Sequence, residues 1–141
     1  MFTSADIDMV IDVNGYNPSG ASFVAPRPER VLDTRLLSPR PTPATSSLFR
    51  PVRVLTIAGG AGVPHTAGSV VINLTVTGST TGGFATVYPC GSPTPNTSNI
   101  NFVAAETVSN LVVADVSDQG TICLFSTSNP EYVVDLVAYH P

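Results

Sequence analysis

The sequence contains no lysine and no tryptophan, and only 11% of its residues are charged. Its six basic residues are all arginines, and they lie in the first 53 positions. The formal net charge is −4, whereas a protein that binds a nucleic-acid backbone needs a basic surface. We therefore expect no nucleic-acid partner.

Long apolar runs are also absent. The apolar stretches are four to six residues long before a polar residue or glycine interrupts them, and a transmembrane helix needs about 20 such residues. Hydrophobic residues still make up 43% of the 141 positions, which is enough for one hydrophobic core. We expect a globular domain without membrane insertion.

Cysteine is scarce, since Cys90 and Cys123 are the only two in the chain. Two cysteines cannot supply the four ligands of a structural zinc site. Each lies in a strand-like segment, and an even count favours a disulfide formed in an oxidising compartment. We therefore predict a disulfide and an extracellular or cell-surface location; two buried free thiols in a cytosolic protein are the alternative.

Histidine is equally rare, and His65 and His140 are the only two. A catalytic triad needs a histidine oriented by a carboxylate and facing a nucleophile, and no Gly-x-Ser-x-Gly elbow is present. The acidic residues near the N-terminus do not form a calcium-binding loop motif. We expect no catalytic residue, no metal site and no cofactor, and therefore no enzyme.

Alternation of apolar and polar residues is the dominant pattern. In residues 69–78, for example, one face of the expected strand carries Val70, Ile72, Leu74 and Val76. Similar segments predict about nine strands in all, the others lying at 9–16, 31–34, 52–57, 84–89, 100–104, 110–116, 121–126 and 132–139. Residues 117–120 predict a tight hairpin between two of them.

Short strands separated by frequent turns are typical of sandwiches and barrels. We predict an all-β fold, an antiparallel β-sandwich of the jelly-roll type. A weaker similarity between residues 69–76 and 109–116, spaced by 40 positions, makes a β-trefoil the alternative fold. The proline-rich residues 38–51 predict a long loop or an edge crossing.

The two ends of the chain resemble each other. Residues 8–18 align without gaps to residues 131–141, at an offset of 123 positions, with identities at Val10/Val133, Asp12/Asp135, Tyr16/Tyr139 and Pro18/Pro141. Self-similarity at a fixed spacing indicates tandem repeats. We predict that residues 1–18 hold the closing strand of a preceding repeat or an extra edge strand, and that residues 19–141 form one β-sandwich module.

An additional strand needs a partner. Its predicted face for assembly carries Met9, Ile11, Val13 and Tyr16. An unpaired strand edge is a template for strand addition, in cis to a neighbouring unit or in trans to another molecule. We therefore expect this strand to lie at a contact between units or between chains.

Several segments together resemble a known repeat module. They are the motif Ala-Pro-x-x-x-Arg-Val-Leu-Asp-Thr-Arg at 25–35 and the stretches 57–64, 71–76, 86–91, 98–102 and 133–139. In this order they resemble a β-module found, often in tandem, in secreted and cell-wall-associated proteins of high-GC Gram-positive bacteria. The resemblance implies location and architecture, and it implies no particular activity.

Two groups of residues are candidate ligand contacts. Asp33 and Arg35 alternate to one face, where they form either a polar site for a sugar or peptide or an ion pair that anchors the loop at 38–51. The second group is an aromatic ring beside three amides: Tyr88, Asn96, Asn99 and Asn101. The amides could equally be turn residues that satisfy their own backbone.

These observations leave two functions open. The first is a non-catalytic surface or assembly module, a spacer or adhesin-like repeat whose partners are neighbouring copies. The second is a carbohydrate-binding module that holds a secreted enzyme on a cell wall, with a cell-surface polysaccharide as partner. Aromatic residues make up only 7% of the chain, so the sequence favours the first.

Overall fold

The computed structural model describes residues 23–35 and 52–141. This part of the chain contains eight strands and no helix, and hence no helix that could cross a membrane. The strands are β1 (Glu29–Asp33), β2 (Val52–Thr56), β3 (Ser69–Thr77), β4 (Gly83–Pro89), β5 (Ile100–Phe102), β6 (Val108–Asp115), β7 (Thr121–Ser126) and β8 (Glu131–His140).

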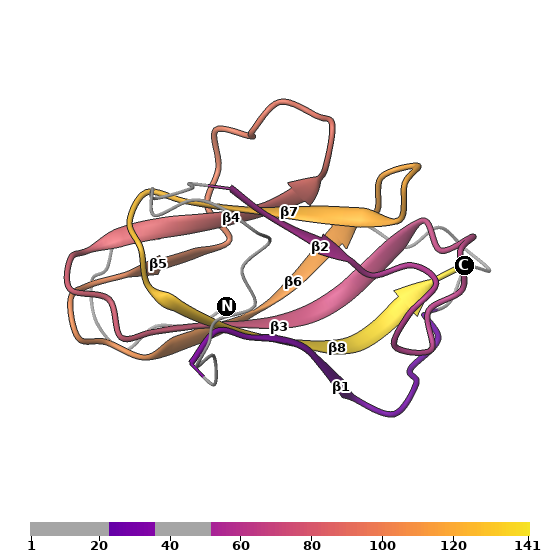
Figure 1. Ribbon diagram of the computed structural model, residues 1–141, viewed down its shortest axis with the longest axis horizontal. Coiled ribbons are helices and arrows are strands. Elements are labelled where there is room, and N and C mark those ends of the chain that lie inside the picture. Colours follow the sequence, from indigo (N-terminus) through magenta and orange to yellow (C-terminus); the bar gives the residue numbers. More distant parts are fainter. Residues whose placement is uncertain (1–22, 36–51) are drawn as a thin grey trace, which may run out of the picture.

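The strands form two four-stranded antiparallel sheets that pack face to face (Figure 1). Sheet A has the order β1-β8-β3-β6, and sheet B has the order β2-β7-β4-β5. The first strand therefore pairs with the last, the second with the seventh, the third with the sixth and the fourth with the fifth. The predicted all-β sandwich is confirmed.

The alternative β-trefoil is wrong. The two similar segments that suggested it are β3 and β6, and these strands pair with each other over eight positions within sheet A. A three-fold fold would place repeated strands in separate units around an axis. Their similarity instead reflects a shared position, because both lie in sheet A with one face toward the core.

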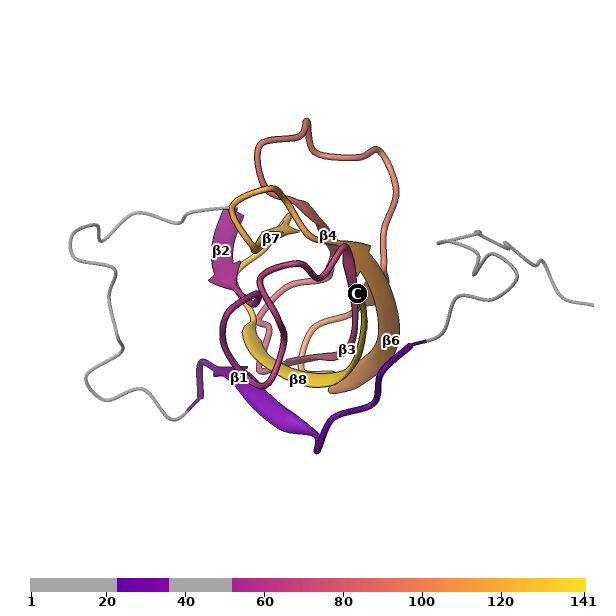
Figure 2. The same cartoon turned by 90° about the vertical axis from the view of Figure 1, so that its right-hand side faces the viewer.

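The core lies between the two sheets. Along β3, the side chains of Val70, Ile72, Leu74 and Val76 are at most 1% exposed, which confirms the alternation predicted for this segment. Opposite them, Val87 of β4 and Leu124 of β7 contribute to the same cluster. The end-on view shows sheet A curving beneath sheet B around this interior (Figure 2).

The segment 117–120 makes a tight turn, but the hairpin predicted there is wrong. The amide of Gly120 donates to the carbonyl of Ser117 at 2.8 Å, and the amide of Ser117 donates to the carbonyl of Thr121 at 3.0 Å. The strands on either side are β6 and β7, which belong to different sheets. Both strands bury a face in the core, so the chain crosses from one layer to the other at this turn.

Two predicted elements lie outside the described residues. The strand at 9–16 and the proline-rich loop at 38–51 therefore stay predictions, and so does the count of nine strands. The other boundaries agree to within a few residues, and β7 has the predicted bounds.

Candidate functional site

The two residues singled out at the end of β1 bind each other. The guanidinium of Arg35 donates to both carboxylate oxygens of Asp33, from Nε at 2.9 Å and from Nη2 at 2.7 Å. The backbone amide of Arg35 adds a third bond, at 3.1 Å. This bidentate arrangement is the ion pair that the motif predicted as one of its two roles.

Arg30 extends the ion pair across the sheet. It donates to Asp33 at 3.2 Å and, through Nε and Nη2, to both oxygens of Asp135 on β8 at 2.8 and 3.2 Å. Arg30 and Asp135 also face each other in the register of the two strands. The charged cluster Arg35–Asp33–Arg30–Asp135 thus fastens the edge strand β1 to β8.

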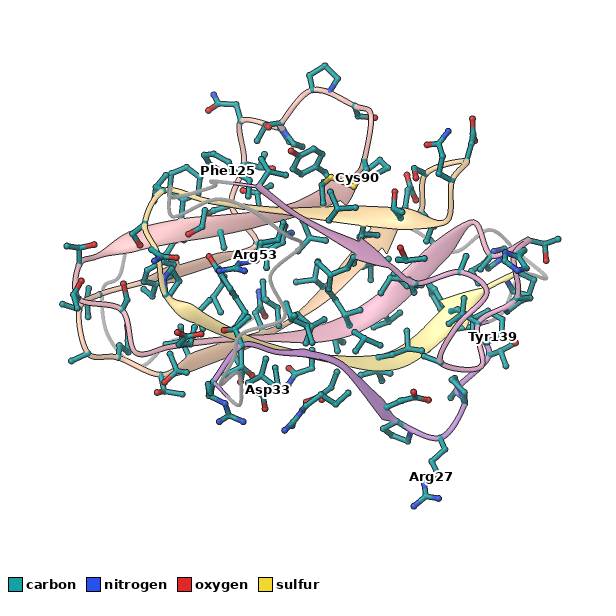
Figure 3. All side chains as sticks on the ribbon, in the orientation of Figure 1. Arg27, Asp33, Arg53, Cys90, Phe125 and Tyr139 are labelled. Atoms are coloured by element: carbon teal, nitrogen blue, oxygen red, sulfur yellow. A yellow bond between two sulfur atoms is a disulfide. The ribbon has the colours of Figure 1, made fainter. Side chains whose placement is uncertain are left out.

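Electrostatics favour the charged state of this cluster. The Asp33 side chain is only 5% exposed, and its hydrogen bonds from Arg35, opposed by partial desolvation, lower its pKa from 3.8 to about 2. The hydrogen bond to Asp135 raises the pKa of Arg30 in turn. Figure 3 shows Asp33 near the end of β1, close to β8, and Arg27 projecting away from the sheets.

A shallow hollow of ≈ 380 Å³ lies beside the cluster and is lined by Pro28, Glu29, Arg30 and Asp135. Two of its polar groups, Arg30 and Asp135, are already bound to each other in a bidentate pair. A sugar or peptide would therefore have to compete with an intact ion pair. The geometry favours a structural role for this cluster.

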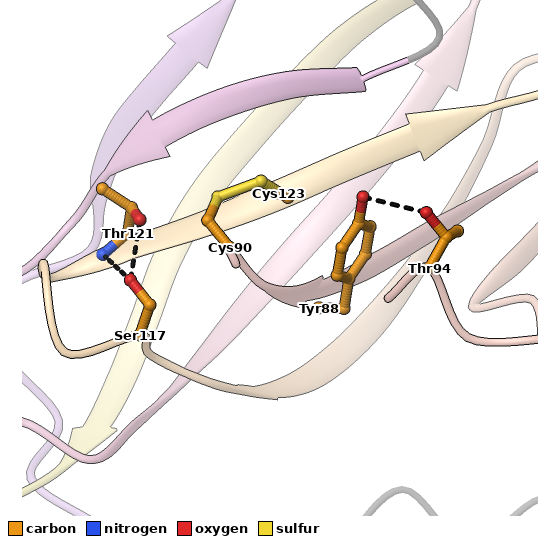
Figure 4. Close-up of a disulfide and its surroundings, with 6 residues drawn as sticks. All are labelled: Tyr88, Cys90, Thr94, Ser117, Thr121 and Cys123. Atoms are coloured by element: carbon orange, nitrogen blue, oxygen red, sulfur yellow. Dashed lines mark hydrogen bonds between the residues drawn. A yellow bond between two sulfur atoms is a disulfide. The ribbon is translucent and has the colours of Figure 1, made fainter. Parts of the chain in front are cut away.

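The second candidate group is mostly occupied by internal contacts. Tyr88 is only 6% exposed, and its hydroxyl accepts a hydrogen bond from Thr94 at 3.1 Å (Figure 4). The side-chain oxygen of Asn99 accepts the backbone amide of Val87 at 2.6 Å. The ring therefore offers no open face for stacking on a sugar.

The remaining two amides of this group differ from Asn99. Asn96 lies in the loop between β4 and β5 and is exposed, and Asn101 is exposed on β5 opposite Phe84. They do not gather around the Tyr88 ring as a cleft, because that ring is covered and Asn99 is turned to the β4 backbone. Loop stabilisation explains Asn99 better than ligand contact.

The predicted disulfide is present. Cys90, just after β4, is bonded to Cys123 on β7, with a Cα–Cα distance of 5.0 Å (Figure 4). The bond joins neighbouring strands, because Tyr88 faces Cys123 in the register of β4 and β7. A disulfide of this kind indicates an oxidising, extracellular setting.

The other edge of sheet A is formed by β6, whose sequence Val-Ser-Asn-Leu-Val-Val-Ala-Asp has no lysine, arginine or proline. It pairs with β3 along its whole length without a bulge. Its outer face carries Leu111, which is 56% exposed. Natural edge strands are commonly protected by charge, proline, bulges or shortness, and β6 has none of these devices apart from Asp115 at its end.

The free backbone groups of β6 can be assigned from its register. The amide of Val116 donates to the carbonyl oxygen of Gly68, the residue before β3, at 2.9 Å. In a regular antiparallel pair the direction of backbone groups alternates, so the amides and carbonyls of Ser109, Leu111, Val113 and Asp115 point away from β3. Among the described residues no strand pairs with this side of β6.

The remaining candidate groups among the described residues are potential metal ligands and the two histidines. No group of three or more potential metal ligands occurs among them. Neither histidine forms a hydrogen bond or ion pair with a carboxylate in this part of the chain; His140 instead contacts Phe23 with ring centroids 5.9 Å apart. The candidate assembly residues Met9, Ile11, Val13 and Tyr16 lie outside the described residues.

Sequence reasoning missed two features of the site. It did not pair Arg30 with Asp135, which are 105 positions apart. It identified the β6 segment as a strand but could not recognise it as an edge, although its lack of basic residues and proline is visible in the sequence. The signal would have been this composition combined with the strand order.

Comparisons with known proteins add no family assignment. No protein-family model matches the chain, and no curated protein is significantly similar to it. The resemblance of its motifs to a secreted bacterial repeat module therefore stays a prediction.

Proposed function

We propose that this protein is a non-catalytic extracellular assembly module of jelly-roll topology, whose copies join through the β6 edge of sheet A. The observation that supports this best is an eight-residue edge strand that pairs without irregularity and has its only charge, Asp115, at its end, with Leu111 exposed on its outer face. The nested strand pairs are those of a jelly roll, and the disulfide fits an extracellular module.

The partner that fits this edge is β6 of a second copy. In an antiparallel pair centred on Val112, Leu111 lies opposite Val113 of the other copy, and Ser109 lies opposite Asp115. Both pairs use backbone groups that point away from β3. The register brings apolar side chains together, pairs each carboxylate with a serine hydroxyl, and keeps the two carboxylates at opposite ends of the contact.

This pairing satisfies the symmetry expected of a dimer. An isologous two-fold contact uses the same surface on both molecules, and here the two copies of sheet A become one eight-stranded sheet. Strand addition supplies main-chain hydrogen bonds, and side chains at alternate positions supply specificity. A carbohydrate-binding role is supported less well, because Tyr88 is buried and Asn99 is bound internally.

The experiment is to place a charge on the edge. Leu111→Lys replaces an apolar contact with Val113 of the other copy by a strongly hydrated ammonium on the outer face, so we expect at least about a tenfold weaker self-association, corresponding to about 1.4 kcal/mol. Val54→Lys is the matched control, since Val54 is 64% exposed on β2, an edge strand of sheet B. Sedimentation of both variants and the wild type gives the association constants.

The outcome distinguishes the edges. Loss of association in Leu111→Lys with wild-type association in Val54→Lys supports the proposal. Equal effects of the two substitutions, or a wild-type protein that remains monomeric at high concentration, would overturn it. Thermal unfolding of both variants checks that the fold is unchanged.

A further inference from the structure

The outer face of sheet B is largely apolar, although it lies outside the core. On β7, Leu124 points into the core and is 2% exposed, so its neighbours Cys123 and Phe125 point outward. Register and alternation place these outward side chains of the neighbouring strands beside them: Val52 and Val54 on β2, and Phe84, Thr86 and Tyr88 on β4. Val54 is 64% exposed, and Phe84 and Phe125 are half-buried. An apolar surface of this kind is typical of a binding site.

Phe84 and Phe125 form an aromatic pair on this face. Their ring centroids are 6.0 Å apart, and the ring planes are tilted by 53°. Figure 3 shows Phe125 on the outer side of sheet B. Tyr88 shares the face but is only 6% exposed and is bound by Thr94 of the loop after β4. The two phenylalanines therefore supply the aromatic surface that Tyr88 does not.

No charged side chain of the four strands lies on this face. Arg53 is the only charged residue in β2, β4, β5 and β7. Its guanidinium carbon lies 5.6 Å from the ring centroid of the buried Tyr132, between the two sheets (Figure 3). Residues 90–99, which link β4 to β5, carry no charge either. A neutral face favours a neutral ligand, because a charge that is buried without a partner costs free energy.

Neutral hydrogen-bonding groups border the aromatic pair. Asn101 is exposed on β5, opposite Phe84 in the strand register. Asn96 is exposed in the loop between β4 and β5, which projects away from sheet B (Figures 1 and 2). Neither of these two amide side chains has a hydrogen-bond partner in the part of the chain that the structure describes. They can therefore bind a ligand without breaking an internal bond.

The loop between β4 and β5 is fixed to the sheet at both of its ends. The disulfide joins Cys90, at the start of the loop, to Cys123 on β7. Near the end of the loop, the side-chain oxygen of Asn99 accepts the backbone amide of Val87 at 2.6 Å. A surface that is fixed before the ligand binds loses less conformational entropy on binding.

We infer that the outer face of sheet B binds a neutral polysaccharide, whose sugar rings lie against Phe84 and Phe125 and whose hydroxyl groups pair with the Asn101 amide. A pyranose ring has an apolar face of C–H bonds and a rim of hydroxyl groups. It therefore matches aromatic side chains that are bordered by neutral polar groups. Because β6 belongs to sheet A, the inference goes beyond the proposed assembly and holds for a single copy as well as for a dimer.

The experiment titrates the full chain with three soluble probes, the neutral hexasaccharides of glucose, of mannose and of N-acetylglucosamine. We expect at least one probe to bind and to shift the backbone amide resonances of β4, β5 and β7. Phe125→Ala should raise the dissociation constant at least about tenfold, and Phe125→Tyr, which keeps a ring, should bind within a few-fold of the wild type. Phe23→Ala is the matched control, since Phe23 is 39% exposed and contacts His140, outside this face.

A second variant keeps the test valid if Phe125→Ala unfolds. Asn101→Ala removes an exposed amide, and we expect it to weaken binding while the melting temperature stays close to that of the wild type. Polygalacturonate, an acidic polymer, is the probe for charge, and it should bind more weakly than the neutral probe.

Three results would overturn the inference. They are no binding of any neutral probe, wild-type affinity in the folded Phe125 and Asn101 variants, and an equal loss of affinity in Phe23→Ala. Tighter binding of polygalacturonate contradicts it as well. None of these results bears on the β6 edge, whose test is self-association of the Leu111 variant, so failure of one proposal is distinguishable from failure of the other.

Discussion

The two edge strands of sheet A, β1 and β6, differ in how far they are protected against pairing with another chain. β1 is five residues long, three of which are charged, and its pairing with β8 shifts register between Arg30 and Leu32. β6 is eight residues long and pairs without interruption, and its single charge is at the end. A free edge invites pairing with another chain; β1 has charge and a register shift that protect against such pairing, and β6 lacks both along most of its length.

The difference is also one of energetics. β1 is fastened by ion pairs in which a nearly buried carboxylate is held by two arginines. β6 is held by backbone pairing with β3 and by the core residues Val112 and Ala114. The comparison teaches that one sheet can hold one edge strand by ion pairs and the other by backbone pairing and apolar burial; the proposed assembly uses the second edge.

The largest expected effect on stability comes from the disulfide, which lies in sheet B away from both edges. Replacing Cys90 and Cys123 by serine opens a loop with a sequence separation of 33, and the chain-entropy model gives a loss of about 3.5–4 kcal/mol. Denaturant unfolding measures this. Self-association under native conditions should be unchanged. If the substitutions lower both the free energy of unfolding and the self-association, the edges of sheet A do not act independently of the core.

Proline substitutions at adjacent positions of β6 should have a smaller effect on stability, and they distinguish the two directions of its backbone amides. Val112→Pro removes an amide directed at β3, so we expect destabilisation of at least about 1–3 kcal/mol from the orphaned partner group. Val113→Pro removes an amide that points away from β3, so it should mainly weaken self-association. Unfolding and sedimentation together measure the two effects, and equal destabilisation by both substitutions contradicts the assigned direction of the backbone groups.

The smallest effect concerns acid and the β1 edge. The pKa of Asp33 is lowered from 3.8 to about 2, so its carboxylate stabilises the folded state above about pH 3.8. This contribution is lost as the pH falls through about 2. Asp33→Asn should therefore lower the melting temperature most at pH 5, and the difference from wild type should narrow toward pH 2; a difference that does not change with pH would refute the ion-pair account.

Local patterns predicted much of this fold. Period-2 alternation predicted the core face of β3, and the bounds of β7 follow from its apolar composition between two turns. The disulfide was predictable because two cysteines in strand-like segments have few other roles. Each of these features depends on residues close together in the sequence or on a simple count.

Long-range relations were not predictable in the same way. The turn at 117–120 reverses the chain locally, but the sheet that each strand joins depends on packing in the core. β6 and β7 therefore lie in different sheets. The bond from Arg30 to Asp135 depends on the first and last strands being neighbours. Tyr88 has a polar tip and an apolar ring, so its burial depends on how the loop after β4 covers it.

Backbone hydrogen exchange in β6 tests the assembly account most directly. The amides of Ser109, Leu111, Val113 and Asp115 point away from β3, so they should exchange quickly in dilute protein and become protected as concentration rises. The amides of Asn110, Val112 and Ala114 should be protected at every concentration. If the protein self-associates while the first group stays unprotected, β6 is not the joining edge.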